Sequence, residues 1–322
     1  MRLRLVPQET NWDFFKYRTV TFGFSVVLMV ASLVLWLTVG LNFGIDFRGG
    51  TTIRTQAEQP VDVGAYRDAI APLELGDVSI SEVFDPSFAS DQHVAMIRIQ
   101  AQDGEESASA EVISRVEAAL QAVDDSVRFT QVESVGPKVS GELIQTAVLA
   151  VAAALAAILF YIWLRFEWQF SVVAVAALFH DVLVTIGVFS LLQIRFDLAT
   201  IAALLTIIGY SINDTVVIFD RLRENLRKYK TKPLQDVMNL SVNETLSRTL
   251  MTSGTTLIAL IALLVLGGDV IRGFVFAITW GVVIGTYSSV YVAKNVVLWL
   301  GVKRDWSKPT DTTGNQFANI DA

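Results

Sequence analysis

The sequence contains no cysteine among its 322 residues, so disulfide bridges, thiolate metal sites and cysteine nucleophiles are excluded. Charged side chains are also scarce. They make up 18% of the chain, whereas about a quarter is usual for a soluble domain. Hydrophobic residues, by contrast, make up 52%. This imbalance predicts a protein that lies mostly in a lipid bilayer.

Motifs of common enzyme classes are missing as well. The chain has no GxSxG, no HExxH and no P-loop with its GK(S/T) ending. We therefore expect no enzymatic activity, no resident cofactor or metal, and no nucleic-acid ligand. Because an ATP site is not recognisable, the energy for any transport is expected to come from an ion gradient or from a partner protein.

Six apolar runs are long enough to cross a hydrocarbon core of about 30 Å, which takes about 20 helical residues. They comprise residues 20–41, 143–164, 170–192, 198–219, 250–266 and 273–293. The first run follows basic residues, as a signal peptide does, but it is too long and no small-x-small cleavage site follows it. The sequence therefore predicts an α-helical membrane protein with six transmembrane helices, the first an uncleaved anchor.

Residues 42–141 are polar and have a different periodicity. Strands are predicted at 51–56, 77–84, 93–100 and 126–133, and helices at 61–71 and 107–123. The order β-α-β-β-α-β is typical of a ferredoxin-like α+β domain. This stretch holds 17 acidic and 7 basic residues, a net charge of −10, so we expect it to be solvated and outside the membrane.

Basic residues predict the orientation, because they concentrate in cytoplasmic connections. They precede the first run, fill the connection between the fourth and fifth, and follow the sixth, where the sequence places Lys294, Lys303, Arg304 and Lys308. The opposite side has only Arg195 and Arg272 besides the acidic domain. The predicted organisation in the inner membrane is a cytoplasmic N-terminus (1–19), a first helix (20–41), a periplasmic domain (42–141), helices two to six (142–300) with a cytoplasmic connection (220–249), and a cytoplasmic tail (301–322).

The fourth run contains an acidic residue, Asp214, about 9 Å inside the predicted cytoplasmic edge. A charge within a span costs about 2.5–3.5 kcal/mol and usually marks a transport pathway. Thr206, Tyr210 and Asn213 share the helical face of Asp214 at spacings of three and four residues. The alternative is a neutral carboxylic acid that only hydrogen-bonds to a neighbouring helix.

Two further positions carry polar chemistry. His180 and Asp181 lie at the middle of the third run, and Arg248 stands where the fifth run begins. A buried carboxylate can switch between charged and neutral forms, and an arginine facing the same cavity shifts that balance. We therefore expect a proton path through Asp214 and Arg248, with His180 and Asp181 as further candidates. Alternatively, the His-Asp pair locks two helices together and Arg248 is an interfacial snorkelling residue.

Small residues form a stripe on the sixth run, where Gly281, Gly285 and Ser289 recur every four residues. Such stripes allow close helix packing, either within the chain or with a partner. Packing within the chain is the more common use of this pattern.

Several longer motifs together resemble the SecF family, the smaller half of the SecDF accessory complex of the bacterial translocase. They occupy residues 43–51, 135–137, 180–181, 208–215, 244–249 and 252–256. The resemblance places the chain in the RND superfamily, whose members use twelve spans in two halves. It implies that SecD supplies the other half, that SecYEG, YajC and translocating preproteins are partners, and that a proton gradient (or sodium, in some relatives) supplies energy. Asp214 and Arg248 match the family's proton-path positions, and His180 and Asp181 match a family motif.

Three other functions stay open on the sequence. The chain could be half of an RND exporter of lipids or small molecules, although such exporters usually have larger periplasmic domains and both halves in one chain. It could be a non-transporting scaffold subunit, whose polar membrane residues only determine helix packing. An intramembrane enzyme is the weakest of the three, because no catalytic motif is present.

Overall fold

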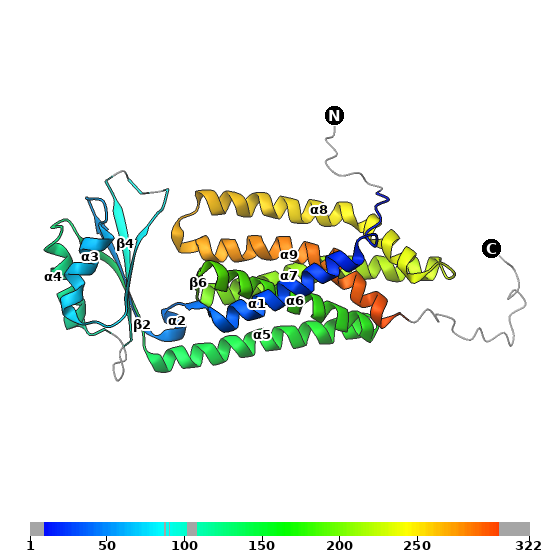
Figure 1. The fold of residues 1–322 in the computed structure, drawn as a ribbon, viewed down its shortest axis with the longest axis horizontal. Coiled ribbons are helices and arrows are strands. Elements are labelled where there is room, and N and C mark those ends of the chain that lie inside the picture. Colours follow the sequence, from blue (N-terminus) through cyan, green and yellow to red (C-terminus); the bar gives the residue numbers. More distant parts are fainter. Residues whose placement is uncertain (1–9, 87, 90, 102–107, 303–322) are drawn as a thin grey trace, which may run out of the picture.

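The computed structural model describes residues 10–86, 88–89, 91–101 and 108–302. Within them the chain forms a long helical bundle with a small α+β domain at one end (Figure 1). The predicted tail falls almost entirely outside the described residues, and so do Lys303, Arg304, Lys308 and the first nine residues.

Six helices of the described residues are long and apolar enough to cross a membrane, as predicted. They are α1 (Arg18–Thr38), α5 (Pro137–Arg165), α6 (Trp168–Leu192), α7 (Leu198–Lys228), α8 (Leu234–Leu266) and α9 (Asp269–Leu300). Helices α6, α7 and α9 bury the most surface, whereas α1, α5 and α8 lie at the periphery and expose most of their apolar side chains. The bundle therefore has a central layer of three helices.

Helices α7 and α8 continue well beyond the apolar runs that predicted them. Helix α7 extends nine residues past Phe219, and α8 begins 16 residues before Leu250, so only residues 229–233 separate them. The intervening residues are charged or polar, but most are good helix formers. Hydropathy shows where a span leaves the bilayer and not where its helix ends. The described part of the 220–249 connection contains no separate surface helix.

The small domain has the predicted order of elements. Its described elements are β2 (Gly50–Ala57), α3 (Val63–Ile70), a 3₁₀ turn η1 (Ala71–Leu73), β3 (Val78–Val83), β4 (His93–Gln100), α4 (Ala110–Gln121) and β5 (Arg128–Val135). The strands form an antiparallel sheet in the order β3-β4-β2-β5. Ile53 and Ile97 pair across β2 and β4 and, with Val116 and Leu120 of α4, are fully buried. The core thus lies between one sheet face and the helices.

A short connection that the sequence does not reveal joins this domain to the bundle. Strand β1 (Asn42–Phe43) pairs in parallel with β6 (Arg195–Phe196), and α2 (Ile45–Arg48) follows. The chain then enters β2 through Gly50, whose φ of +124° favours glycine. A Cβ on Gly50 would lie 2.3 Å from the carbonyl oxygen of Ile99, so a side chain is excluded there.

The domain has a second attachment to the bundle, at the start of α9. The backbone N–H of Phe84, just after β3, donates to Oδ2 of Asp269 at 2.5 Å. The backbone N–H of Asp269 donates in return to the carbonyl oxygen of Phe84 at 3.0 Å. Helix α9 is therefore tied directly to the domain.

Candidate functional site

A cluster of buried polar groups joins the three central helices around Asp181. Both His180 and Asp181 of α6 are fully buried. Nδ1 of His180 lies 2.9 Å from Oδ1 of Asp181, while Ser211 of α7 and Ser288 of α9 donate to Oδ2 at 2.6 and 2.8 Å. The carboxyl group thus connects α6 with both neighbouring helices. Such bonds satisfy a polar group whose burial would otherwise be costly.

The imidazole of His180 is less well satisfied. Its Nε2 is buried and has no hydrogen-bond partner among the described residues. The ring lies 6.3 Å from that of Tyr287, centroid to centroid. An unpaired buried nitrogen costs free energy, so His180 lowers the stability of this cluster in the described arrangement.

A second polar cluster surrounds Asp214, one helical turn after Ser211 on α7. Asp214 is 6% exposed, and Ser253 of α8 donates to its Oδ2 at 3.4 Å. Ser253 also lies 2.7 Å from the hydroxyl of Thr286 on α9. This cluster therefore connects α7, α8 and α9. Because both clusters include α7 and α9, a change at either carboxyl group bears on the same pair of helices.

The predicted polar face of the fourth span divides in two. Tyr210 is half-buried and its hydroxyl lies 2.5 Å from that of Thr256 on α8. Thr206 and Asn213, by contrast, are exposed, and Thr206 donates only to the carbonyl oxygen of Ala202 in its own helix. Tyr210 and Asp214 are thus the residues of this face with hydrogen bonds to α8 among the described side chains.

Arg248 lies in the middle of α8 and is exposed. Its guanidinium forms no ion pair with an acidic residue in the described ranges, Asp214 included. It is nevertheless close enough for its charge to act on Asp214 electrostatically. The structure thus places Arg248 near the second cluster without a direct bond to it.

The small-residue stripe of α9 faces α7. A Cβ on Gly281 would lie 2.2 Å from the side chain of Ile207, and one on Gly285 would lie 3.1 Å from that of Ser211. The hydroxyl of Ser289 lies 2.9 Å from that of Thr215. This close approach brings the hydroxyl groups of α9 within reach of α7, so the stripe also positions the polar clusters.

The burial of one basic residue was not predicted. Lys294 lies in α9, within the predicted range of the membrane helices (142–300), but it is fully buried, whereas the sequence suggested a basic residue at the cytoplasmic end of the last span. Its Nζ contacts the carbonyl oxygen of Phe14 and lies 4.6 Å from the ring centroid of Phe15. The N-terminal segment folds back over this ammonium group, which no local sequence signal shows.

Sequence reasoning also missed the partners of the two carboxyl groups. Ser211 and Ser288 donate to Asp181. Thr286 lies within hydrogen-bonding distance of Ser253, which donates to Asp214. Single serines and threonines are common in membrane helices, and only their spacing relative to Asp181 and Asp214 on other helices gives them significance. Only the packing of the helices therefore shows which hydroxyl groups belong to the two clusters.

A six-helix membrane unit with buried carboxyl groups on its central helices and an α+β domain between its first two spans is the architecture of a membrane transport subunit. Comparison with known proteins agrees. Residues 115–303 match the family model "Protein export membrane protein SecD/SecF, C-terminal", and residues 34–61 match "SecD/SecF GG Motif". The chain belongs to the SecF family of protein translocase subunits, and its role is in protein translocation.

The similarity extends over the whole chain. It is 72% identical to the SecF subunit of Cereibacter sphaeroides, covering 100% of this chain and 99% of the relative. It is 41% identical to that of Vibrio alginolyticus, covering 95% of each. The crystal structure of SecDF from Thermus thermophilus matches 93% of the chain with a TM-score of 0.81 and 35% identity. The chain spans only 40% of that SecDF chain.

Proposed function

We propose that this chain is the SecF half of a SecDF-type complex that uses an ion gradient to assist preprotein translocation. The match to part of a longer SecDF chain supports a SecD partner that supplies the remaining half. The exposed polar groups of Thr206 and Asn213, on a membrane-spanning helix, support a partner helix on that face. SecYEG, YajC and the preprotein are further partners in this proposal.

The observation that carries the proposal is the pair of polar clusters on α7 and α9. Each carboxyl group accepts hydrogen bonds from a neighbouring helix. Uptake of a proton by Asp214 or Asp181 removes the charge that these hydroxyl groups stabilise, and so weakens the ties between the helices. Protons are the coupling ion in this proposal, with sodium as the alternative.

Helix α9 connects the clusters to the domain. It carries Thr286, Ser288 and Ser289 in its middle and Asp269 at its start, where the domain is attached at Phe84. A shift of this helix would therefore reach the domain without passing through a flexible linker. The ferredoxin-like domain faces the periplasm in this proposal, and both termini face the cytoplasm, as the distribution of basic residues predicts.

Preprotein release from inverted membrane vesicles under an imposed pH gradient tests the proposal. Each variant is coexpressed with SecD. We expect Asp214→Asn to abolish the stimulation by the gradient while expression and complex assembly stay normal. Asp220→Asn is the matched control, because Asp220 lies on the same helix but is exposed and forms an ion pair with Arg165. If the pH gradient still stimulates release in Asp214→Asn, Asp214 has only a structural role, and the scaffold function is favoured.

One observation favours the alternative function, a scaffold subunit that does not transport. Asp181 is fully buried and accepts hydrogen bonds from α7 and α9, as a purely structural acid would. The same vesicle assay with Asp181→Asn separates the two functions. Loss of gradient stimulation with intact assembly would support coupling, and loss of assembly would support a scaffold.

A further inference from the structure

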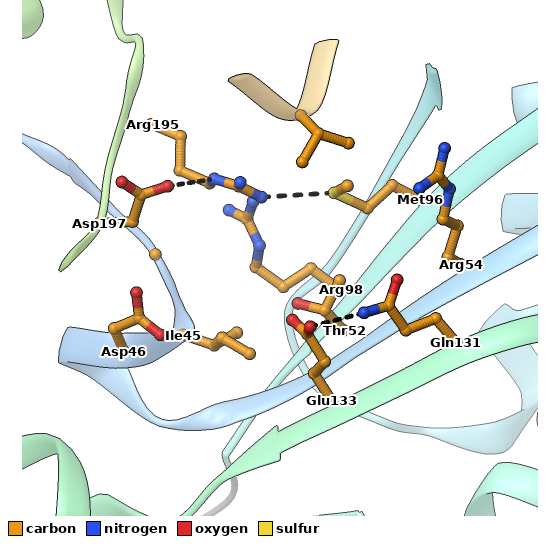
Figure 2. A pocket seen from close by; sticks show the side chains of 12 residues that line it. Ile45, Asp46, Thr52, Arg54, Met96, Arg98, Gln131, Glu133, Arg195 and Asp197 are labelled. Atoms are coloured by element: carbon orange, nitrogen blue, oxygen red, sulfur yellow. Dashed lines mark hydrogen bonds and ion pairs between the residues drawn. The ribbon is translucent and has the colours of Figure 1, made fainter. Parts of the chain in front are cut away.

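Two arginines meet in a pocket between the domain and the end of the helical bundle. Arg98 extends from the face of β4 opposite the domain core, and Arg195 belongs to β6, between α6 and α7. Figure 2 shows their guanidinium groups side by side in the middle of this pocket, which measures about 140 Å³. That volume suits a small anionic group.

The guanidinium of Arg98 is incompletely hydrogen-bonded. Its Nε is buried without a hydrogen-bond partner among the described residues, and no acidic residue in those ranges forms an ion pair with it. Burial and the nearby charges of Arg195 and Arg48 lower the pKa of Arg98, although Asp197 and Asp46 act in the opposite direction. An unpaired, partly buried guanidinium is costly and is the kind of group that an anion would satisfy.

The nearby carboxylates are already engaged. Asp197 accepts from Nε of Arg195 at 3.1 Å and from the backbone of Thr200 at 3.0 Å, where it caps α7. Asp46 accepts from the backbone N–H of Leu198 at 3.0 Å. On the far wall, Glu133 accepts from Gln131 at 2.8 Å. The Nε of Arg98 therefore remains an unused donor, although the pocket also contains acidic residues.

A second cavity of about 470 Å³ adjoins the first and shares five lining residues with it, Met96, Arg98, Arg195, Asp197 and Val270. Its other walls come largely from the ends of membrane helices. The apolar side chains that the bundle contributes are Ile194, Ala199, Leu264, Val270, Phe274 and Phe276, and the domain adds Val83. Arg272 also lines it and is paired with Asp269, while Glu82 at the domain side is exposed. The two cavities thus form one groove. At its domain end, Arg54, Arg98 and Arg195 lie beside the carboxylates of Asp46, Glu133 and Asp197, and along the helices its walls are apolar.

We propose that this groove binds a phospholipid, with its phosphate between Arg98 and Arg195 and its acyl chains against the apolar walls of α7, α8 and α9. The guanidinium fork binds phosphate oxygens in a bidentate manner, and a groove that joins arginines to apolar walls at the ends of membrane helices fits a lipid better than a free anion. The occupied groove also spans the gap between the domain and the bundle, so lipid binding would hold the two parts together.

Native mass spectrometry of the full-length chain in detergent tests this proposal. The probes are phosphatidylglycerol, a diacylglycerol with the same chains, and inorganic phosphate. We expect one saturable phosphatidylglycerol per chain and binding about tenfold weaker in Arg98→Gln, because a charge-assisted contact is lost. Ala199→Trp should weaken binding similarly by filling the groove while both arginines stay. Arg98→Lys should fall between wild type and Arg98→Gln.

Arg115→Gln is the matched control, because Arg115 is exposed on α4, on the other side of the sheet. It should bind phosphatidylglycerol as the wild type does. Equal binding of phosphatidylglycerol to wild type and Arg98→Gln would overturn the proposal, as would equally tight binding of diacylglycerol. Binding of inorganic phosphate that phosphatidylglycerol does not displace would identify a free-anion site and also overturn it. Unfolding temperatures of all variants confirm that each is folded.

Discussion

Ser288 of α9 donates a hydrogen bond of 2.8 Å to Oδ2 of Asp181 on α6, at a point where both side chains are fully buried. Ser211 of α7 donates to the same oxygen. One carboxyl oxygen therefore joins the three central helices. The stability of the bundle should depend on this oxygen more than on any single hydroxyl that it accepts from.

Removing the acceptor should cost more than removing one donor. We expect Ser288→Ala to destabilise the protein by about 1 kcal/mol and Asp181→Ala by about 2–4 kcal/mol, because the latter leaves two buried hydroxyl groups without this acceptor. Denaturant titration in detergent measures both. Thr206→Ala, which removes an exposed hydroxyl, should change stability little. The double variant Ser288→Ala/Asp181→Ala should lose less stability than the sum of the two single losses. Strict additivity would show that the hydrogen bond between Ser288 and Asp181 contributes nothing.

The contact between Gly281 and Ile207 predicts a steric effect. We expect Gly281→Ala to destabilise the protein by about 1–3 kcal/mol, since the added methyl group would overlap the Ile207 side chain. In an Ile207→Ala background, Gly281→Ala should cost less than it does in the wild type, because the overlapping atoms of Ile207 are gone. Gly209→Ala is the control, because an added Cβ there meets no atom within 4 Å and helix propensity alone favours alanine. Equal effects of the two glycine substitutions would contradict close packing of α9 on α7.

The attachment of the domain at Asp269 can be measured by hydrogen exchange. Asp269→Ala removes the acceptor for the backbone N–H of Phe84, so we expect faster exchange in the segment after β3. Asp236→Ala is a matched control, since Asp236 occupies the first turn of α8 as Asp269 does in α9. Both variants lose a favourable interaction with a helix N-terminus, but only Asp269→Ala should alter exchange near Phe84. Unchanged exchange in both would show that the domain is held elsewhere.

Tyr66 in α3 predicts an alkaline limit to the stability of the domain. Burial and the nearby charge of Asp124 raise its pKa above the ordinary value of 10.0. When the pKa is higher in the folded than in the unfolded state, the stabilisation is fully present at a pH below the unfolded-state pKa. It is lost as the pH rises through the folded-state pKa. We therefore expect Tyr66→Phe to lose less stability than wild type above about pH 10, measured by thermal unfolding across pH 8 to 11. Parallel pH profiles would exclude Tyr66 as the titrating group.

The sequence by itself determined the six spans and the order of elements in the small domain. Both are local properties: a run of apolar residues or an alternating pattern is visible in any window of the chain. It also identified Asp181 and Asp214 as unusual, because a carboxyl group in an apolar run stands out by its cost alone. Helix ends were less predictable, as α7 and α8 show, because a helix continues outside the bilayer wherever its residues favour it.

Only the tertiary structure decided which polar groups meet. The rotation and close approach of the helices, set in part by Gly281 against Ile207, bring Ser288 to Asp181 and leave Asn213 exposed on the helix that carries Asp214. The same is true of Lys294, which the returning N-terminal segment covers, and of Arg98, which meets Arg195 from a distant part of the chain. These contacts depend on how separate elements pack, and no single stretch of sequence contains that information.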